Sequence, residues 1–175
     1  MLHALAVRLA ADAEAVAERY VGALRADGRF PGARALSSVQ LRDHATPFVG
    51  LIASQLMIVG ETRGAAPELL GDGAQVQRVM AELHGAQRQR LGWSESDIER
   101  EEPILSAEIE RSLRESMSTA GADGASTDRA LGAEPTTEPA RAALQYAAVA
   151  ARQMLEQGTR TSIRAYRFAK STVTS

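Results

Sequence analysis

Cysteine is absent from the 175 residues of this chain, and aromatic residues make up only 4% of them. Without cysteine there is no disulfide framework, no thiolate zinc site and no cysteine nucleophile. A chain without cysteine also fits the reducing cytosol, and we expect a cytoplasmic protein. Because large aromatic side chains are few, the core must consist mainly of leucine, isoleucine, valine and alanine.

An excess of charge of either sign is also absent, since 20 basic residues face 22 acidic ones. No overall field therefore attracts nucleic acid or an anionic membrane surface, and we expect no nucleic-acid partner. The most apolar run, residues 48–59, is interrupted by Gly50, Ser54 and Gln55. It is shorter than the roughly 20 residues that a spanning helix needs, so we predict no insertion into a membrane.

Apolar residues recur at helical spacing along most of the chain, and no strand-like alternation occurs. Pro47 predicts a kink or a break near Ala45, and the glycine-rich stretch 60–73 is expected to be a loop. The main helices are expected at roughly 2–25, 38–59, 74–91, 95–117 and 138–170. We therefore predict an all-α protein, either globin-like or a helical bundle of about five main helices.

Three parts are expected along the chain: a helical core over 1–117, a linker over 118–139 and a C-terminal helix over 140–175. The linker prediction follows from its glycine, alanine, serine, threonine and proline content, which is typical of a flexible linker or a long loop. The last helix is expected to pack on the core.

Two of the expected helices have clear apolar faces. Ser94 and Asp97 form a cap at the start of the helix over 95–117. The residues expected to point inward from that helix are Ile98, Leu105, Ile109 and Leu113. Those expected to point inward from the helix over 74–91 are Val76, Val79, Met80, Leu83 and Leu91.

Four polar residues near these faces are candidates for a ligand site. His44 and Gln55 lie on the apolar face of the helix over 38–59. They are either buried and bonded to neighbouring groups, or they line an internal ligand pocket. His84 and Arg88 share a face at the edge of a buried stripe. They either pair with acidic residues of the next helix or grip an anionic ligand, because the arginine fork suits a carboxylate.

Motifs for catalysis or metal binding are missing from the sequence. No HxxxH or ExxH spacing joins the histidines, so we predict no metal site. We also find no phosphate-binding loop, no GxSxG motif and no GxGxxG after a strand. Glu101, Glu102 and Glu108 have apolar neighbours, but such carboxylates are usually solvated or paired. We therefore predict that the protein is not an enzyme.

Basic residues gather at the end of the last expected helix, at Arg160, Arg164, Arg167 and Lys170. Cations there complement the helix dipole, which is reason enough for their presence. The same ridge is a candidate surface for docking a partner through Arg160, Arg164 and Arg167. DNA is a poor candidate for that partner, because no helix-turn-helix pattern accompanies the ridge.

A family resemblance covers residues 9–117 and is carried by two segments, LRDHATPFVGLIASQL and VMAELHGAQRQRLGWSESDIEREEPILSAEIERSL. They resemble the N-terminal sensor domain of the stressosome co-antagonist (Rsb) proteins and of related bacterial sensor kinases. The matched points are residues 41–44, His84, Arg88, Gly92, Ser94, Arg100-Glu101 and Leu105. The chain departs from the pattern at Glu102, where an aromatic residue is common, at Pro103, and in the long stretch 118–139.

The resemblance implies a non-catalytic sensor that dimerises and relays a signal to an output domain or a downstream protein. Better-characterised relatives look like globins without haem, and they dimerise through their terminal helices. We accordingly expect a homodimer, with the alanine-rich face of the last helix, around Ala151, and the first helix at the interface.

Cofactor binding can be judged from the same resemblance. In an alignment with haem globins, Arg88 stands where the haem-ligating histidine is needed, and His84 comes one turn too early. Haem is therefore disfavoured, and we expect no cofactor. An apolar ligand such as a fatty acid could fill the core, with its polar end at His44, His84 or Arg88. The alternatives are a haem or other cofactor-binding gas or redox sensor, and a pure protein-interaction module.

Overall fold

The computed structural model describes residues 1–42, 44–63, 65–120 and 137–173. These residues are almost entirely helical, and no strand occurs among them. The elements in chain order are α1 (Leu2–Ala11), α2 (Ala13–Ala26), the 3₁₀ helix η1 (Pro31–Ala35), α3 (Ser38–Arg42), α4 (Ala45–Thr62), α5 (Pro67–Arg90), α6 (Glu95–Ala120) and α7 (Glu138–Val173). The predicted all-α helical bundle is confirmed, and a globin-like arrangement stays a prediction.

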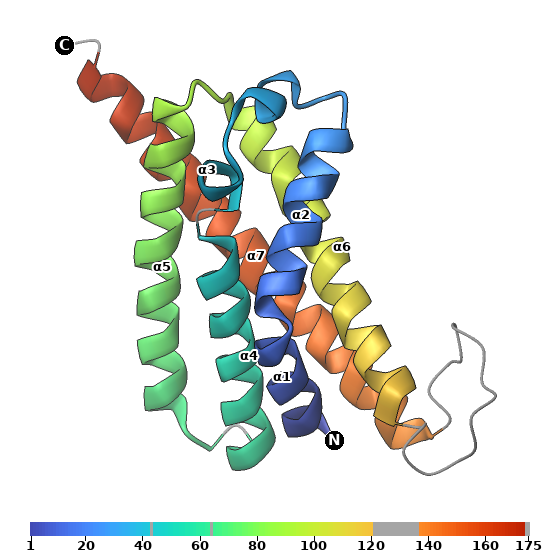
Figure 1. Ribbon diagram of the computed structural model, residues 1–175. Helices are drawn as coiled ribbons and strands as arrows, with labels where there is room; N and C mark the ends of the chain where they lie inside the picture. The colour runs from blue at the N-terminus through green and yellow to red at the C-terminus, as the bar shows by residue number, and fades with distance from the viewer. Residues whose placement is uncertain (43, 64, 121–136, 174–175) are drawn as a thin grey trace.

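The helices close into a ring around one core (Figure 1). α1 and α2 follow each other along the bundle and pack on α4 and α6. α4 lies beside α5, α5 packs on α7, and α7 packs on α6 and so completes the ring. The most deeply buried apolar side chains come from α1, α2, α3, α4 and α6: Leu9, Val16, Leu24, Leu41, Val49, Ile52, Leu56, Ile98, Ile109 and Leu113.

The first expected helix, over 2–25, is two helices that meet at Asp12. Aspartate is a poor residue for a helix interior, because its side chain competes for hydrogen bonds. Here its carboxylate accepts a hydrogen bond from Ser112 of α6, at 3.0 Å. The break predicted from Pro47 is confirmed, since α4 begins at Ala45. Pro47 thus lies in the first turn of α4, where its missing N–H is tolerated.

The predicted loop over 60–73 is wrong. α4 continues to Thr62, and α5 already begins at Pro67, a residue well suited to the first position of a helix. Of the glycines that suggested a loop, Gly60 is part of α4, and Gly71 and Gly73 are part of α5. Gly73 lies so close to α4 that a Cβ atom would overlap the side-chain amide of Gln55. These atoms are the end of a flexible side chain, which could move aside for a Cβ atom.

The connection between α5 and α6 is set by local hydrogen bonds. Gly92 has a φ of 77°, a left-handed conformation that favours glycine. Its N–H donates to the carbonyl of Gln89, and the N–H of Trp93 donates to the carbonyl of Arg88, both at 3.0 Å. This pair of bonds is a Schellman motif, which ends α5 and places Trp93 beside Arg88.

The cap predicted for α6 is confirmed. The N–H of Ser94 donates to the Asp97 carboxylate at 2.8 Å, and the N–H of Asp97 donates back to the Ser94 hydroxyl at 3.2 Å. The apolar line predicted to point inward from this helix is buried throughout: Ile98, Leu105, Ile109 and Leu113. Local and periodic signals therefore agree for α6.

The inward face predicted for α5 is wrong for three of its five residues, whereas Met80 and Leu91 are partly buried and pack against the core. Val76, Val79 and Leu83 are about half exposed. The buried face instead carries Gly73, Gln77, Ala81, Gly85 and Arg88. Small residues let α5 lie directly against α7, where the Ser162 hydroxyl donates to the Ala81 carbonyl at 2.8 Å. The close contact with α7 therefore decides which face of α5 turns inward.

The predicted linker over 118–139 is helical at both ends, because α6 extends to Ala120 and α7 begins at Glu138. Its central part, 121–136, lies outside the described residues. The alanine-rich face of α7, expected at a dimer interface, instead belongs to the core, with Ala147 and Ala151 buried. α1, the other helix expected there, packs on α4 and α6. The chain thus covers the alanine-rich face of α7 itself, whereas α1 keeps an exposed side that includes Val7, which is 45% exposed.

One stretch, Ser38–Thr62, is long and apolar enough by composition alone to cross a membrane. The core helix of a globular protein meets the same criterion. Within this stretch α4 buries Phe48, Val49, Ile52 and Leu56 against the rest of the bundle. One third of the apolar window in this stretch is buried inside the bundle.

Candidate functional site

A single arginine is buried where α3, α5 and α6 meet. The Arg88 side chain is only 1% exposed. Its Nε donates to the Glu101 carboxylate at 3.1 Å. Nη1 donates to the Gln40 carbonyl at 3.0 Å and to Oε1 of Gln87 at 3.2 Å. Nη2 donates to the Leu41 carbonyl at 3.0 Å and to Glu101 at 2.5 Å. All five N–H groups of the guanidinium therefore have acceptors within the protein.

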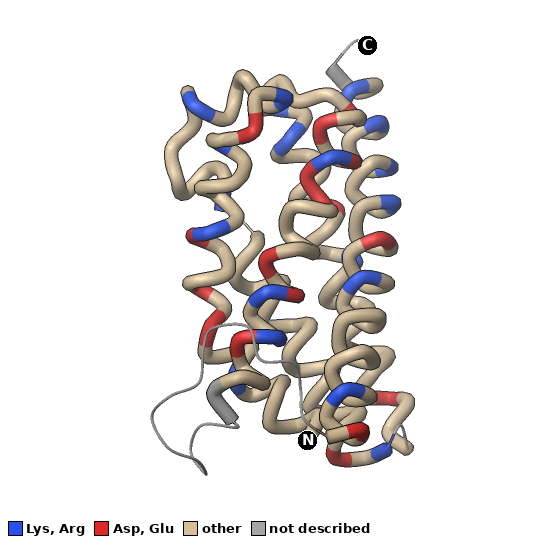
Figure 2. The backbone as a smooth tube through the Cα atoms, turned by 90° about the vertical axis from the view of Figure 1, so that its right-hand side faces the viewer, with Lys and Arg blue, Asp and Glu red and all other residues tan. Residues whose placement is uncertain are grey.

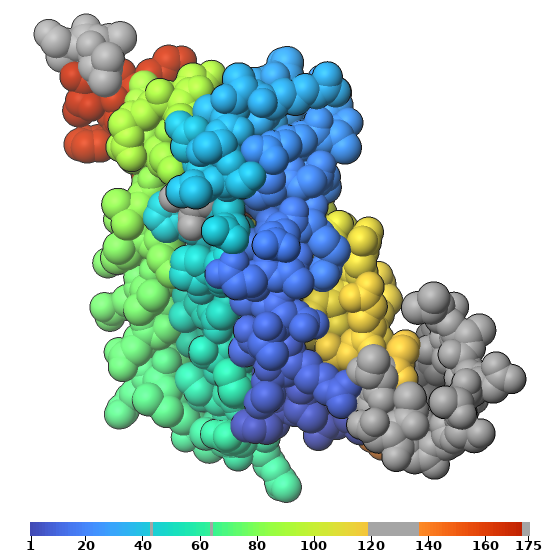
Figure 3. Space-filling view, in the orientation of Figure 1, coloured from blue at the N-terminus to red at the C-terminus, as the bar shows by residue number. Residues whose placement is uncertain are grey.

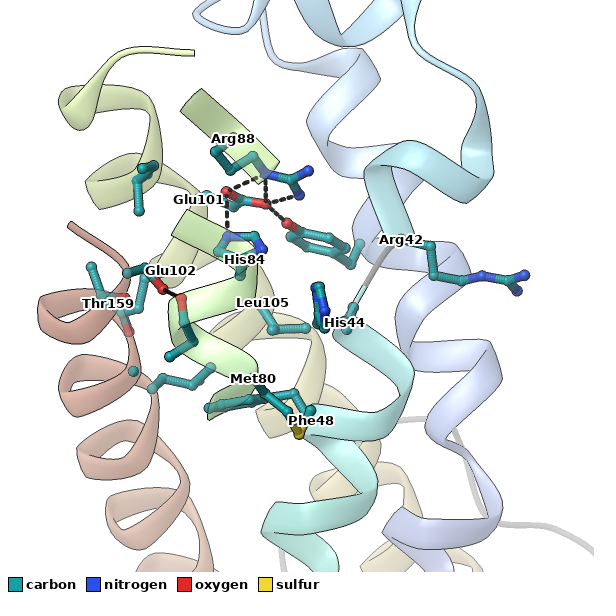
Figure 4. Close-up of a pocket in the computed structure, with 17 residues that line it drawn as sticks. Arg42, His44, Phe48, Met80, His84, Arg88, Glu101, Glu102, Leu105 and Thr159 are labelled. Carbon is teal, nitrogen blue, oxygen red and sulfur yellow. Dashed lines mark hydrogen bonds and ion pairs between the residues drawn. The ribbon is translucent and has the colours of Figure 1, made fainter. Parts of the chain in front are cut away.

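Glu101 is the centre of the cluster. It belongs to the inward stripe of α6 and its side chain is 5% exposed. Besides Arg88, the carboxylate accepts a hydrogen bond from the hydroxyl of Tyr20 and lies 3.2 Å from Nε2 of His84 (Figure 4). Residues from α2, α5 and α6 thus converge on one carboxylate. A buried charge needs such compensation, because its transfer out of water is costly.

The pKa shifts of Glu101, Arg88 and Tyr20 determine which of these groups are charged at neutral pH. Burial raises the pKa of Glu101, but the charges of His84 and Arg88 outweigh it and hold the pKa well below 4.5. Burial likewise lowers the pKa of Arg88, yet the negative charge of Glu101 dominates and raises the pKa above its usual value. Burial, followed by the charge of Glu101, raises the pKa of Tyr20 well above 10.0. At neutral pH the carboxylate and the guanidinium are therefore charged, and the phenol is neutral.

Aromatic rings close the cluster on one side. The guanidinium of Arg88 lies 4.5 Å from the centre of the Trp93 ring, a favourable cation–π distance. The Trp93 ring is in turn 5.5 Å from that of Phe30. Since Trp93 is the only tryptophan of the chain, its fluorescence reports directly on the surroundings of Arg88.

A cavity of about 70 Å³ lies beside this cluster, between α4, α5, α6 and α7. Its walls are mainly apolar, with Phe48, Met80, Leu105 and Leu155 contributing the larger side chains. Figure 4 shows the Glu101 cluster at one end and Met80 with Phe48 at the other. The cavity thus combines an apolar interior with a small number of polar groups, as ligand pockets usually do.

Two histidines face each other at this cavity. The ring centres of His44 and His84 are 6.2 Å apart, and the rings are perpendicular. His44 immediately precedes α4, and His84 lies on α5 with its side chain 20% exposed. The third histidine, His3, is on α1, where it pairs with Glu61 at 3.1 Å and takes no part in the cavity.

The structure separates the four candidate ligand residues. His44, His84 and Arg88 line the cavity, whereas Gln55 does not. Gln55 lies at the close contact between α4 and Gly73. For His84 and Arg88, pairing with an acidic residue of α6 is the arrangement that the structure shows. The two histidines are therefore the residues placed to meet a ligand, and Arg88 positions Glu101 behind them.

The predicted basic ridge runs along the C-terminal half of α7 (Figure 2). Arg160 pairs with Glu156 at 3.4 Å on the same helix, and Arg164 donates to the Thr161 hydroxyl. Arg167 pairs with Glu95 of α6 at 2.7 Å. The ridge is thus exposed, and Arg167 also ties the end of α7 to the start of α6.

Tyr20 is the cluster residue that was not expected from the sequence, whereas Glu101 was expected only as one of three carboxylates that are usually solvated or paired. A signal for Glu101 existed, because it falls on the inward stripe of α6 between Ile98 and Leu105. A carboxylate at such a position requires a buried cation. Tyr20 gave a weaker signal: it lies on an apolar stripe, and a buried tyrosine hydroxyl needs a partner.

Glu102 is the second carboxylate at the cavity. Partial burial, followed by the charge of Glu156, raises its pKa above 4.5. Across the described parts of the chain, no three histidine, aspartate or glutamate residues are placed to hold a metal ion together.

Comparison with known proteins gives no match among family models, curated proteins or solved structures. The resemblance to the stressosome sensor domain therefore stays an expectation. The function must be argued from the cavity and its surroundings.

Proposed function

We propose that this chain is a non-catalytic cytoplasmic sensor domain whose ligand occupies the cavity between α4 and α7. The observation that supports this most strongly is the pairing of an apolar cavity with two facing histidines at its edge. Such a site offers apolar contact to most of a small ligand and one or two hydrogen bonds to its polar end.

The size of the cavity limits the ligand. An engineered apolar cavity of about 150 Å³ binds benzene or xenon. At about 70 Å³, the cavity here suits a smaller apolar or weakly polar molecule. The fatty acid suggested by the sequence would fit only if the walls moved. Met80 could allow such movement, because an unbranched thioether side chain adapts its shape easily.

The buried groups that could perform chemistry are already engaged with one another. Every N–H of Arg88 has an acceptor in the protein, and Glu101 accepts bonds from Tyr20, His84 and Arg88. Catalysis usually needs a nucleophile or a base directed at the substrate. This arrangement favours a structural role for the cluster and a binding role for the cavity.

α5 provides a route for a signal. His84 points toward the cavity, and the neighbouring Leu83 points outward. A ligand that displaced His84 would therefore move a helix that also forms the outer surface. Shifts of packed helices of about 1–2 Å are a common means of passing a signal to a partner. We propose that a downstream protein or output domain reads this movement.

A haem-binding gas or redox sensor is the second candidate, because two imidazoles line the cavity with their ring centres 6.2 Å apart. The small volume argues against it, since a haem is far larger than this cavity. A pure interaction module is the third candidate, and it would leave the cavity without a ligand.

Native mass spectrometry of freshly purified protein separates these candidates. We expect a colourless protein that carries a non-covalent small molecule. Leu105→Phe should lose that molecule, because the added ring fills the cavity. Leu69→Phe, the same change at an exposed position of α5, should retain it.

Two results would contradict the proposal. A Soret band that disappears in His84→Ala would instead support the haem sensor. A wild-type protein without any bound molecule, after gentle purification, would support the interaction module.

A further inference from the structure

One exposed surface of the molecule, formed by α5 and α7, carries several large apolar side chains. On α5, Val79 is 49% exposed and Leu83 is 54% exposed, and on α7 Phe168 is 72% exposed. These residues surround a single hollow between the two helices, together with Ala86, Ala165 and Ala169. We call these six residues the α5–α7 face. In Figure 3, α5 forms one edge of the molecule and the end of α7 projects beyond it.

The spacing on α5 is that of a helix seam. Val76, Val79, Leu83 and Ala86 follow one another at intervals of three, four and three residues. This is the heptad pattern of helices that pack on another helix. The bundle itself does not use the seam, since α5 turns its glycine and alanine face inward. The seam is therefore available to a helix from outside the chain.

α7 continues the same pattern on the other side of the hollow. Thr161, Ala165 and Phe168 follow at intervals of four and three residues. Two parallel seams on adjacent helices suit a partner that also offers two helices. Contact between two such helix pairs would form a four-helix arrangement, a common way to bury apolar seams.

The shape and charge of the face fit a second copy of itself. Phe168 protrudes, and the small side chains of Ala86, Ala165 and Ala169 line a hollow beside it. In a two-fold pair the same patch meets itself, so a protrusion beside a hollow is self-complementary. Charges of both signs border the hollow, namely Arg78 and Arg164 with Glu82. A two-fold pairing can set unlike charges opposite each other, whereas an acidic or a basic partner would meet repulsion.

We propose that two copies of this chain pair through the α5–α7 face, with Phe168 of each copy entering the hollow of the other. This pairing differs from the interface expected from the sequence, because Ala151 at the centre of that interface is buried within the chain. The pairing itself does not depend on the proposed function, and only its role in signalling rests on that function. α5 and α7 separate the cavity from this face, since Ala81 and Ser162 line the cavity while Leu83 and Ala165 line the hollow.

Sedimentation equilibrium of the full chain tests the pairing. We expect wild type to be a dimer at about 100 µM. Leu83→Glu and Phe168→Glu should each raise the dimer dissociation constant about 30-fold or more, because a charge would be buried at the centre of the contact. Both residues are exposed in the single chain, so the helical circular dichroism should not change.

Val149→Glu is the matched control, because Val149 lies on α7 outside the α5–α7 face and is 48% exposed. This variant should dimerise like wild type. A wild-type monomer at about 100 µM would overturn the pairing, and so would a dimer that neither Leu83→Glu nor Phe168→Glu weakens. If either Leu83→Glu or Phe168→Glu loses helical content, the dimer dissociation constant of the other variant decides the test.

The pairing and the proposed function can fail separately. Native mass spectrometry of the monomeric Leu83→Glu variant should still find a molecule in the cavity. A monomeric wild type that carries a ligand would overturn the pairing alone. A dimer with an empty cavity would overturn the ligand-sensing function alone.

Discussion

Replacing Arg88 with methionine is expected to lower the free energy of unfolding by about 3–5 kcal/mol. The substitution keeps most of the apolar length of the side chain but removes the cation that compensates Glu101. The carboxylate would then be buried with Tyr20 and His84 as its remaining partners. The carbonyls of Gln40 and Leu41 would also lose their donors, so α3 should become more open to hydrogen exchange.

The matched control is Arg90→Met, two residues further along α5, where the arginine is exposed. It should change the free energy of unfolding by no more than about 0.5 kcal/mol. The double variant Arg88→Met/Glu101→Leu should be more stable than Arg88→Met alone, because it leaves no buried charge. Urea unfolding followed by circular dichroism measures all three. Equal stability of Arg88→Met and Arg90→Met would show that the cluster contributes nothing.

Gly85→Ala is expected to lower the free energy of unfolding by about 1–3 kcal/mol, the usual cost of overpacking. Alanine normally stabilises a helix relative to glycine by up to about 1 kcal/mol. At Gly85 the added Cβ would overlap the backbone carbonyl of Ser162 on α7. Backbone cannot move aside as a flexible side chain can. The two helices must therefore separate, which would disturb the cavity on one side and the α5–α7 face on the other.

Gly71→Ala, in the same helix, is expected to have the opposite effect on the free energy of unfolding. No atom lies within 4 Å of a Cβ placed there, so only the helix propensity changes. This variant should be more stable than wild type by up to about 1 kcal/mol. Thermal unfolding of both variants is the measurement. If Gly85→Ala were also stabilising, the close contact between α5 and α7 would be absent in solution.

The sequence predicted those helices best whose local signals agree with their packing. For α6, the cap at Ser94 and the apolar line of Ile98, Leu105, Ile109 and Leu113 both correspond to the structure. For α5, the apolar periodicity of the sequence and the packing in the structure disagree. Periodicity shows which face of a helix is apolar, but not whether the same chain covers that face. Val79 and Leu83 were assigned to the core for this reason, and they lie on the surface.

The loop predicted over 60–73 is wrong for a related reason, because it was inferred from glycine content. Gly71 and Gly73 suggested a loop, because glycine lowers helix stability in isolation. In the structure Gly73 lies within α5, beside the Gln55 side chain of α4. A contact between side chains of two different helices leaves no local signal in the sequence.

The candidate site was predicted in part. His44, His84 and Arg88 were expected near one another, and they meet at the cavity. The cluster itself depends on Glu101 from α6 and Tyr20 from α2. Their convergence depends on how α2, α5 and α6 pack together, which a helical pattern alone does not specify.

The direct test of a ligand site at the cavity is the proton NMR spectrum of the histidine rings as xenon is added. Xenon enters apolar cavities and makes no demand on specific hydrogen bonds. The chain has three histidines, so each experiment contains its own control. The ring signals of His44 and His84 should shift with saturation, and that of His3, which pairs with Glu61 on α1, should not. Three unmoved signals, or three equal shifts, would contradict a binding cavity between α4 and α5.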